Sequence, residues 1–154
     1  MDADELEVVG ATIAVGKTAV LYGDVSRARS LAQAVARDRN LELVDLSPHY
    51  GEDWRGLPEK QAVGDRLVST KGTPAWILSA LEVTPQIVFL PDVLTAYESM
   101  TSSMQSVIRT LLKDRRFPGH DHGLPPRTGV LAHIGVDQLL PADVANACAR
   151  ITLA

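Results

Sequence analysis

The sequence has almost no cysteine, no long apolar run and no excess of basic charge. Cys148 is the single cysteine, which excludes an internal disulfide and indicates a reducing compartment. No apolar run approaches the roughly 18 residues that a membrane-spanning helix needs. The first ten residues, MDADELEVVG, are acidic and lack the basic segment that opens a secretion signal. We therefore expect a cytoplasmic protein with no membrane association.

The charge balance disfavours a protein whose main task is to bind nucleic acid. The chain has 15 basic and 19 acidic residues, which gives a formal net charge of -4. Binding to a phosphate backbone normally requires a clear excess of Lys and Arg. A chain of 154 residues with 45% hydrophobic and 22% charged residues is typical of one globular domain.

Short apolar runs alternate with segments of helical periodicity along the chain. The apolar runs predict strands at 18–23, 41–47, 86–90, 128–136 and 151–153. The helical segments are 26–39, 74–82, 96–113 and 141–150, the first with Ser26 as its N-cap. Glycine and proline predict a loop over 48–73 and a turn-rich excursion, read as a hairpin, over 116–127. This order predicts an α/β three-layer sandwich, whose ligands lie beyond the carboxyl ends of the strands.

Residues 11–18, ATIAVGKT, satisfy the loosest form of the phosphate-binding loop signature. A working loop of this kind follows a strand and opens a helix, because the helix N-terminus supplies free amides and a favourable dipole. Here Lys17 is followed by TAVLYG, a β-branched and aromatic run that predicts a strand. We therefore interpret Lys17 as part of a solvated turn before a strand.

The strand–loop–helix context occurs a few residues later, in LYGDVSRARSLAQAVA. Aligned with the signature, Gly23 is the first glycine and Ala28 replaces the second. Arg29 replaces the lysine, and Ser30 stands where a magnesium-binding hydroxyl belongs. Ala28 adds a Cβ where the backbone must approach phosphate, and a guanidinium does not substitute for a compact ammonium.

The series of segments resembles the core domain of AAA+ ATPases, most closely the MoxR-like branch. The landmarks are LYG with its helix, DLS at 45–47, WRGLPE at 54–59, TPAWILSAL at 73–81, QIVFLPDV at 86–93, LLKDRRFPGH, LPPRTGVLAHIG at 124–135 and LPADVANACARITL at 140–153. The resemblance extends from about Thr18 to Leu153. It implies a P-loop NTPase-like sandwich with a five-stranded parallel sheet, strand order 5-1-4-3-2, and helices on both faces. Residues 1–154 would then form one AAA+-like domain with an N-terminal extension at 1–16 and no helical lid.

The chain departs from the family pattern at each position that hydrolysis needs. Pro91 stands at the magnesium-binding Asp position, and Asp92 at the Glu position that polarises water. His133 and its neighbours replace the sensor Asn. Asn146 is not followed by the finger arginine, and Arg150 lies three residues beyond that position. One such arginine is worth about 10³–10⁵ in rate, so the resemblance implies a pseudo-ATPase without catalytic residues. A degenerate nucleotide site would comprise Gly23, Ser26, Arg29, Ser30, Asp92 and His133.

The expected function is that of a protein-binding or regulatory module. Its partner would be another copy of the chain, an active AAA+ subunit or a target protein, with no cofactor and no bound metal. One alternative is a weak or partner-completed ATPase that holds ATP and magnesium around Gly23–Ser30 and Asp92. Another is a loader-like subunit associated with nucleic acid, which the acidic balance disfavours. A small divergent core of this kind is also compatible with a viral origin.

Four further positions allow a functional and a structural interpretation. His120 and His122 flank Asp121, but no third ligand is placed nearby, which favours an exposed hairpin tip over a metal site. For His133 a packed, hydrogen-bonded histidine is favoured over a ligand contact. Cys148 is interpreted as a structural thiol, because no His or Asp partner is signalled.

Overall fold

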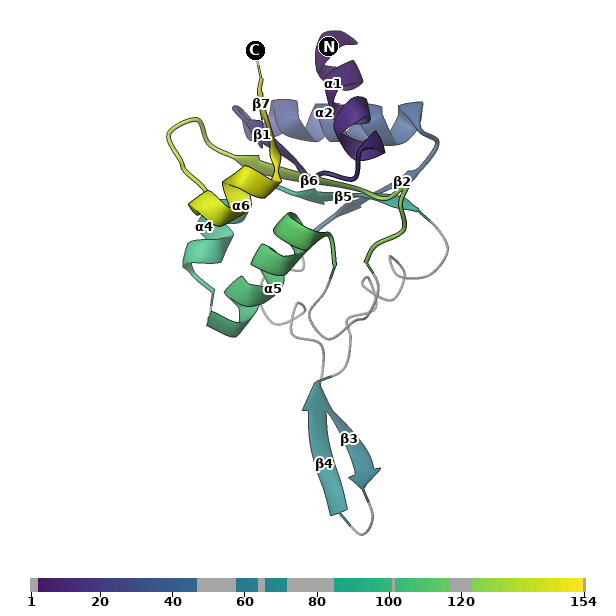
Figure 1. Cartoon of the computed structure of the whole chain (residues 1–154), viewed down its shortest axis with the longest axis vertical. Coiled ribbons are helices and arrows are strands. Elements are labelled where there is room, and N and C mark those ends of the chain that lie inside the picture. The colour runs from purple at the N-terminus through teal and green to yellow at the C-terminus, as the bar shows by residue number, and fades with distance from the viewer. Residues whose placement is uncertain are drawn as a thin grey trace.

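The central element of the fold is a parallel sheet of five strands. The computed structural model describes residues 3–46, 58–63, 66–71, 85–100, 102–116 and 123–153. The strands are β1 (Ala19–Tyr22), β2 (Glu42–Asp45), β5 (Gln86–Leu90), β6 (Gly129–Ile134) and β7 (Ala149–Thr152). They lie in the order β2-β5-β6-β1-β7, and each neighbouring pair is parallel (Figure 1). Counted along the chain, this is the order 5-1-4-3-2, so the predicted α/β class and strand order are confirmed.

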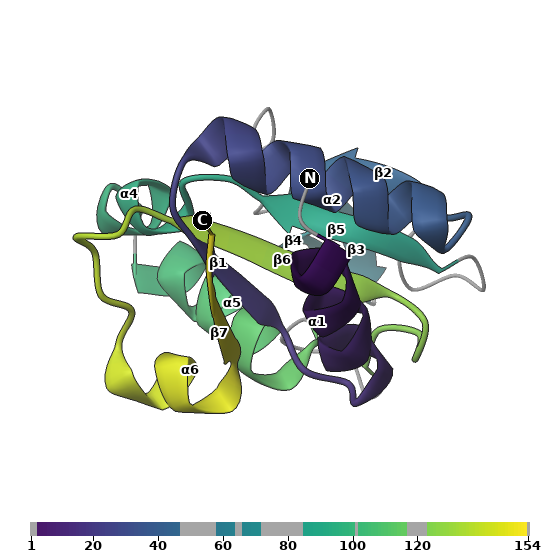
Figure 2. The same cartoon turned by 90° about the horizontal axis from the view of Figure 1, so that it is seen from above.

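Helices cover both faces of this sheet (Figure 2). One layer contains α1 (Ala3–Ala14) and α2 (Val25–Asp38), and the other contains α4 (Val93–Glu98), α5 (Ser102–Asp114) and α6 (Ala142–Ala147). Successive strand residues alternate between two apolar cores. Leu21, Phe89 and Leu131 pack with the α1/α2 layer, whereas Val20, Val88 and Ala132 pack with the other layer. Burial on both faces explains why the strands read as continuous apolar runs.

The predicted N-terminal extension is a helix that belongs to the core. In α1, Val9 and Ile13 are almost fully buried, and Leu6 packs against the same cluster. Their spacing is that of one helix face. Ile13 packs so closely on β6 that a Cβ added to Gly129 would lie 2.6 Å from its Cδ1.

The Gly-Lys-Thr string is the C-terminal cap of α1. Gly16 has a φ of 75°, in the left-handed region that favours glycine. Its N–H donates to the carbonyl of Ile13 at 3.0 Å, and the N–H of Lys17 donates to the carbonyl of Thr12 at 3.1 Å. These two bonds form a Schellman motif, which satisfies carbonyls that the helix end leaves free. As predicted, Lys17 is exposed in a turn before a strand.

Several local predictions are wrong. Within the predicted loop 48–73, β3 (Pro58–Val63) and β4 (Arg66–Lys71) form an antiparallel hairpin that is separate from the central sheet. In the sequence, Gly64-Asp65 separates the two runs, and such a dipeptide favours a two-residue hairpin turn. The loop prediction was wrong because it counted glycine and proline but did not use this signal. The helix α2 begins at Val25, and its N-cap is Asp24, two residues before the predicted N-cap Ser26.

The helix predicted over 96–113 is divided into α4 and α5. The hydroxyl of Ser99 donates to the carbonyl of Ala96 at 2.9 Å, and the side chain of Gln105 donates to the carbonyl of Tyr97 at 2.8 Å. These side-chain bonds satisfy the end of α4 and compete with a continuous helix. The helix predicted at 74–82 lies outside the described residues. Residues 117–122 of the predicted hairpin also lie outside them. The described residues 123–127 of that hairpin form a turn and no strand.

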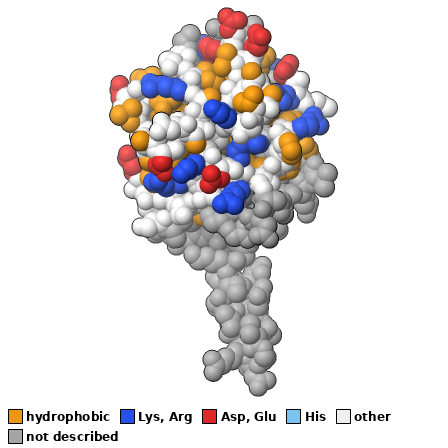
Figure 3. Space-filling view, viewed as in Figure 1, with side chains coloured by type: hydrophobic (Ala, Val, Ile, Leu, Met, Phe, Trp, Pro, Cys, Tyr) orange, Lys and Arg blue, Asp and Glu red, His pale blue; other side chains and the backbone are white. Residues whose placement is uncertain are grey.

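None of the described helices has the length and apolar character to cross a membrane. Basic and acidic side chains are interspersed over the face of the molecule seen in Figure 3. That face therefore lacks the continuous basic surface that typically binds a nucleic-acid backbone.

Candidate functional site at the carboxyl edge of the sheet

The carboxyl ends of the strands bring together three of the six residues predicted for a degenerate nucleotide site. Gly23 follows β1, Asp92 follows β5, and His133 lies near the end of β6 between them. The imidazole of His133 is 4% exposed. Its Nδ1 accepts the backbone N–H of Asp92 at 3.0 Å, and its Nε2 lies 2.8 Å from the carbonyl oxygen of Gly23. Because an N–H must donate to Nδ1, we assign the proton to Nε2, which donates to Gly23.

Both ring nitrogens of His133 are therefore used within the protein. A ligand could reach either ring nitrogen only by breaking one of these part-buried bonds and leaving a backbone group without its partner. Such a loss costs about 1–3 kcal/mol for each group. His133 is thus a packed, hydrogen-bonded residue that joins two strand-end turns.

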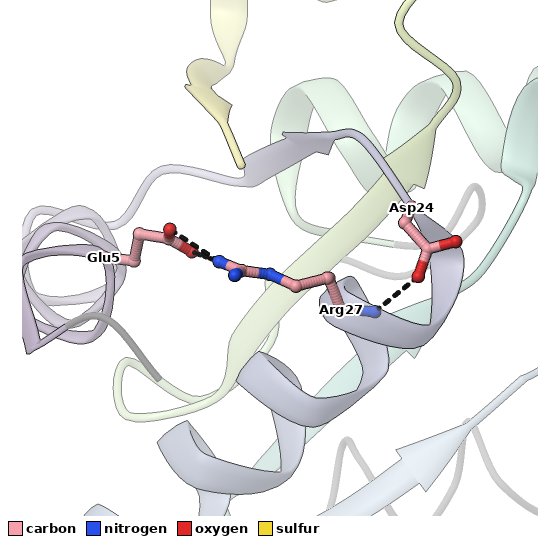
Figure 4. A network of polar contacts seen from close by, with 3 residues as sticks. All are labelled: Glu5, Asp24 and Arg27. Atoms are coloured by element: carbon pink, nitrogen blue, oxygen red, sulfur yellow. Dashed lines mark hydrogen bonds and ion pairs between the residues drawn. The ribbon is translucent and has the colours of Figure 1, made fainter. Parts of the chain in front are cut away.

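The connection from β1 to α2 consists of Gly23 and Asp24 alone. Asp24 adopts an extended conformation, and its Oδ2 accepts the N–H of Arg27 at 3.1 Å (Figure 4). Its carbonyl accepts the N–H of Ala28 at 3.0 Å. A helix N-terminus attracts anions through these free amides and its dipole. Here the carboxylate of Asp24 occupies that position.

The arginines of the first turns of α2 are both paired with carboxylates. Nη2 of Arg27 lies 2.7 and 2.8 Å from the two carboxylate oxygens of Glu5, which ties α2 to α1 (Figure 4). Arg29 forms an ion pair with Asp45 at the end of β2, and its guanidinium lies 5.5 Å from the centre of the Phe89 ring. The guanidinium that replaces the loop lysine is therefore held against the neighbouring strands.

The remaining predicted residues do not converge on one point. Ser26 and Ser30 are exposed on α2, and within the described part of the chain neither forms a hydrogen bond with Asp92 or His133. Asp92 is exposed and has a φ of 49°, an uncommon conformation for a residue other than glycine. Its Oδ1 accepts the hydroxyl of Thr95 at 3.0 Å.

A second set of polar contacts links the turn after β5 to the loop after β6. The side-chain nitrogen of Gln138 donates to the hydroxyl oxygen of Thr95 at 3.3 Å. The side-chain oxygen of Gln138 accepts the N–H of Gly135 at 2.8 Å. With the bond from Thr95 to Asp92, these contacts hold the two loops together without a bound ligand. Sequence reasoning missed Gln138, because its role depends on the adjacency of β5 and β6.

Lys17 lies at the opposite edge of the sheet. It precedes the first residue of β1, whereas Gly23 follows the last. Tyr22 lies five positions after Lys17, or roughly 16 Å at about 3.3 Å per residue of extended chain. Near Lys17, the Sγ of Cys148 donates to the carbonyl of Leu112 at 3.4 Å, and burial raises the pKa of this thiol to about 11. This edge therefore offers no reactive thiolate at neutral pH.

Arg150, the arginine nearest the finger position, lies on β7 at the sheet edge. Its guanidinium stacks 4.2 Å from the centre of the Tyr22 ring. This is a cation–π contact within the chain, and it keeps the guanidinium on the body of the domain.

The residues at the carboxyl edge do not fit ATP with magnesium. A triphosphate needs a basic cradle and free amides, but this edge presents the carboxylates of Asp24 and Asp92 and a two-residue connection.

The apolar cavity between α4, α5 and α6 has a volume of about 10 Å³, room for about one water molecule. Within the described ranges no three His, Cys, Asp or Glu side chains cluster as metal ligands, and His120–His122 lie outside these ranges.

The chain matches no protein-family model and has no significant match among curated proteins.

Proposed function

We propose that the chain is a protein-binding or regulatory module built on a degenerate AAA+ core of MoxR-like type. In this proposal the domain retains the sheet and helices of an ATPase but neither binds nor hydrolyses ATP. Its partner is a protein: a copy of the chain, an active AAA+ subunit or a target.

The observation that best supports this proposal is the bridge that His133 makes from Gly23 to Asp92. In open α/β sheets, ligands bind in the crevice beyond the carboxyl ends of the strands. At this edge of the chain, bonds of 2.8 and 3.0 Å join the protein's own groups, which favours a module that binds no ligand there. The strand order gives independent support, since the AAA+ resemblance implies that order.

The carboxylate of Asp24 gives a second line of support. It accepts the N–H of Arg27 at the N-terminus of α2, and it would repel a phosphate that approached these amides. The positive charge of Arg29 does not offset this repulsion, because its guanidinium pairs with Asp45. A weak or partner-completed ATPase would have to break both arrangements before binding ATP.

Calorimetric titration with ATP and magnesium separates the two functions. A non-binding module gives no saturable heat up to about 1 mM nucleotide, which corresponds to binding weaker than about -4 kcal/mol. The ATPase alternative requires submillimolar affinity that Arg29→Ala abolishes, with slow turnover. A matched control is Arg37→Ala, because Arg37 is an exposed arginine in the last turn of the same helix. Submillimolar binding that is sensitive to Arg29→Ala and insensitive to Arg37→Ala would refute the proposed function.

A further inference from the structure

The exposed apolar side chains of the molecule concentrate at the carboxyl edge of the sheet. Five large hydrophobic side chains are exposed among the described residues, and three of them belong to this edge: Val25, Val136 and Leu139. Val25 opens α2 directly after the turn that follows β1, and the other two lie in the loop between β6 and α6. Val136 is 61% exposed and Leu139 is 76% exposed. Side chains of this kind in one region mark a candidate interaction site.

The two segments that carry these side chains start from neighbouring strand ends. β1 and β6 are adjacent parallel strands, with Tyr22 opposite Ile134. The N–H of Gly23 donates to the carbonyl of Ile134 at 3.3 Å, so the chain leaves both strands at the same point. Figures 1 and 2 both place the loop between β6 and α6 on the side of the molecule where α4 lies. At the left margin of the body in Figure 3, hydrophobic side chains reach the surface, with acidic and basic side chains beside them.

The charge at this edge is negative. The exposed aspartates Asp24, Asp92 and Asp137 lie in the segments that follow β1, β5 and β6. The nearby cations are accounted for by partners within the chain: Arg27 pairs with Glu5, Arg29 pairs with Asp45, and Arg150 stacks on Tyr22. Even with Arg150 counted as a free charge, three aspartates leave a negative balance among these residues.

Contacts within the chain hold the loop in place. Gln138 bonds to Gly135 and to Thr95, and Leu140 packs against the core beneath α4 and α5. Val136, Asp137 and Leu139 are exposed, whereas the side chains of Gln138 and Leu140 contact the rest of the domain and fix the loop backbone. A preorganised surface loses little conformational entropy on binding.

We propose that this edge, defined by Val25, Val136, Asp137 and Leu139, docks a basic, leucine-rich segment of a partner protein. The inference rests on the proposed function and specifies the surface and the partner chemistry. Apolar side chains of the partner would cover Val136 and Leu139, and its Lys or Arg side chains would pair with the surrounding aspartates. Charge complementarity favours such a segment over an acidic one or a nucleic acid.

The test is a titration of the ¹⁵N-labelled full chain with two synthetic peptides, followed by amide chemical shifts. One peptide is a 14-residue helix of Lys and Leu with leucines at helical spacing, and the other has every Lys replaced by Glu. We expect saturable shifts from the Lys peptide at residues 23–25, 92–95 and 135–140, weakened by added salt, and none from the Glu peptide. Shifts spread over acidic positions throughout the surface, or absent from 135–140, would overturn the proposal.

A pair of matched double variants separates this surface from general charge attraction. Asp137→Asn with Leu139→Ser removes one exposed acid and one exposed apolar side chain from the loop. Glu7→Gln with Val8→Ser makes the same change on α1, where both side chains are also exposed. We expect the loop variant to raise the peptide Kd at least about tenfold, as the loss of a buried leucine contact does, and the α1 variant to leave it unchanged. Equal effects of the two variants would overturn the assignment.

Three further outcomes have defined meanings. Shifts at 135–140 that appear on concentrating the chain alone would overturn the assignment to another protein, because they would identify a second copy as the occupant. Absence of peptide binding together with absence of ATP binding would refute this inference and leave the proposed function standing. Submillimolar ATP binding would refute the proposed function itself.

Discussion

The imidazole of His133 joins the backbone of Asp92 to that of Gly23, residues that are 69 positions apart in the sequence. Nδ1 accepts the amide of Asp92 at 3.0 Å, and Nε2 donates to the carbonyl of Gly23 at 2.8 Å. The ring thus fixes the turns after β5 and β1 to the strand between them. In our account this bridge replaces a ligand as the group that closes the crevice.

Replacing His133 should destabilise the fold. His133→Leu keeps much of the side-chain volume but leaves the N–H of Asp92 and the carbonyl of Gly23 without partners. Both bonds are part-buried, so at about 1–2 kcal/mol for each group, the lower part of the range for unsatisfied groups, we expect a loss of about 2–4 kcal/mol in the free energy of unfolding. His133→Gln retains a donor and an acceptor and should lose less. Urea denaturation measures both, and a change below about 0.5 kcal/mol for His133→Leu would contradict the bridge.

Gly129 should not tolerate a side chain. A Cβ at this position would lie 2.6 Å from Cδ1 and 2.9 Å from Cγ1 of Ile13, and 3.0 Å from Cδ1 of Ile87. We expect Gly129→Ala to cost about 1–3 kcal/mol, as overpacking of a core typically does. Ile13→Val removes the nearest methyl group, so the double variant should recover part of that loss. Strictly additive effects in denaturant unfolding would show that α1 does not pack on β6 in this way.

The Gly-Lys-Thr string should behave as a helix cap. Gly16 has a φ of 75°, and a Cβ there would lie 3.5 Å from Nη1 of Arg115, an ordinary contact. Gly16→Ala should therefore cost about 1–2 kcal/mol through backbone conformation alone, and Gly16→Asn should cost less. Lys17→Ala should change stability by less than about 0.5 kcal/mol, as exposed substitutions usually do. Thermal unfolding of the three variants tests this order. A large loss of stability for Lys17→Ala would contradict it and show that the Lys17 side chain stabilises the fold.

The thiol of Cys148 should react slowly in the folded protein. Burial raises its pKa from 9.0 to about 11, with a smaller opposing effect from the charge of Lys17. At pH 8 the thiolate population should be about 100-fold lower than in the unfolded chain, and its reaction with a disulfide reagent correspondingly slower. Comparing rates with and without denaturant measures this ratio, and rates within about fivefold would contradict the burial.

The raised pKa of Cys148 also predicts how the stability of the fold depends on pH. The folded-state pKa lies above the unfolded value, so folding favours the protonated thiol. That contribution is fully present below pH 9 and is lost as the pH rises towards about 11. Cys148→Ala should remove this part of the alkaline dependence.

The central sheet was predictable because its strands are buried on both faces. Segments such as QIVFL at 86–90 have no polar side to obscure the signal, and the strand order followed from the family resemblance. The helix α1 was missed although Leu6, Val9 and Ile13 have helical spacing, because the acidic start was read as an extension. The split between α4 and α5 depends on side-chain bonds from Ser99 and Gln105, which compete locally with helix continuation.

The candidate site was predictable only in outline. The sequence placed Gly23, Asp92 and His133 at strand ends, and parallel strands bring such positions to one edge. It could not show that His133 uses both ring nitrogens, because Gly23 and Asp92 are distant in the chain. Asp24 did carry a signal, since an Asp directly before a helical segment is a favoured N-cap.

The most direct test of the central claim is the amide spectrum of the ¹⁵N-labelled chain with about 5 mM ATP and magnesium. If the protein's own groups close the carboxyl edge, the amides of Gly23, Arg27 and Asp92 keep their chemical shifts throughout the titration. Saturable shifts of these three amides would contradict the account, because they would place the nucleotide at the backbone groups to which the side chains of His133 and Asp24 bond.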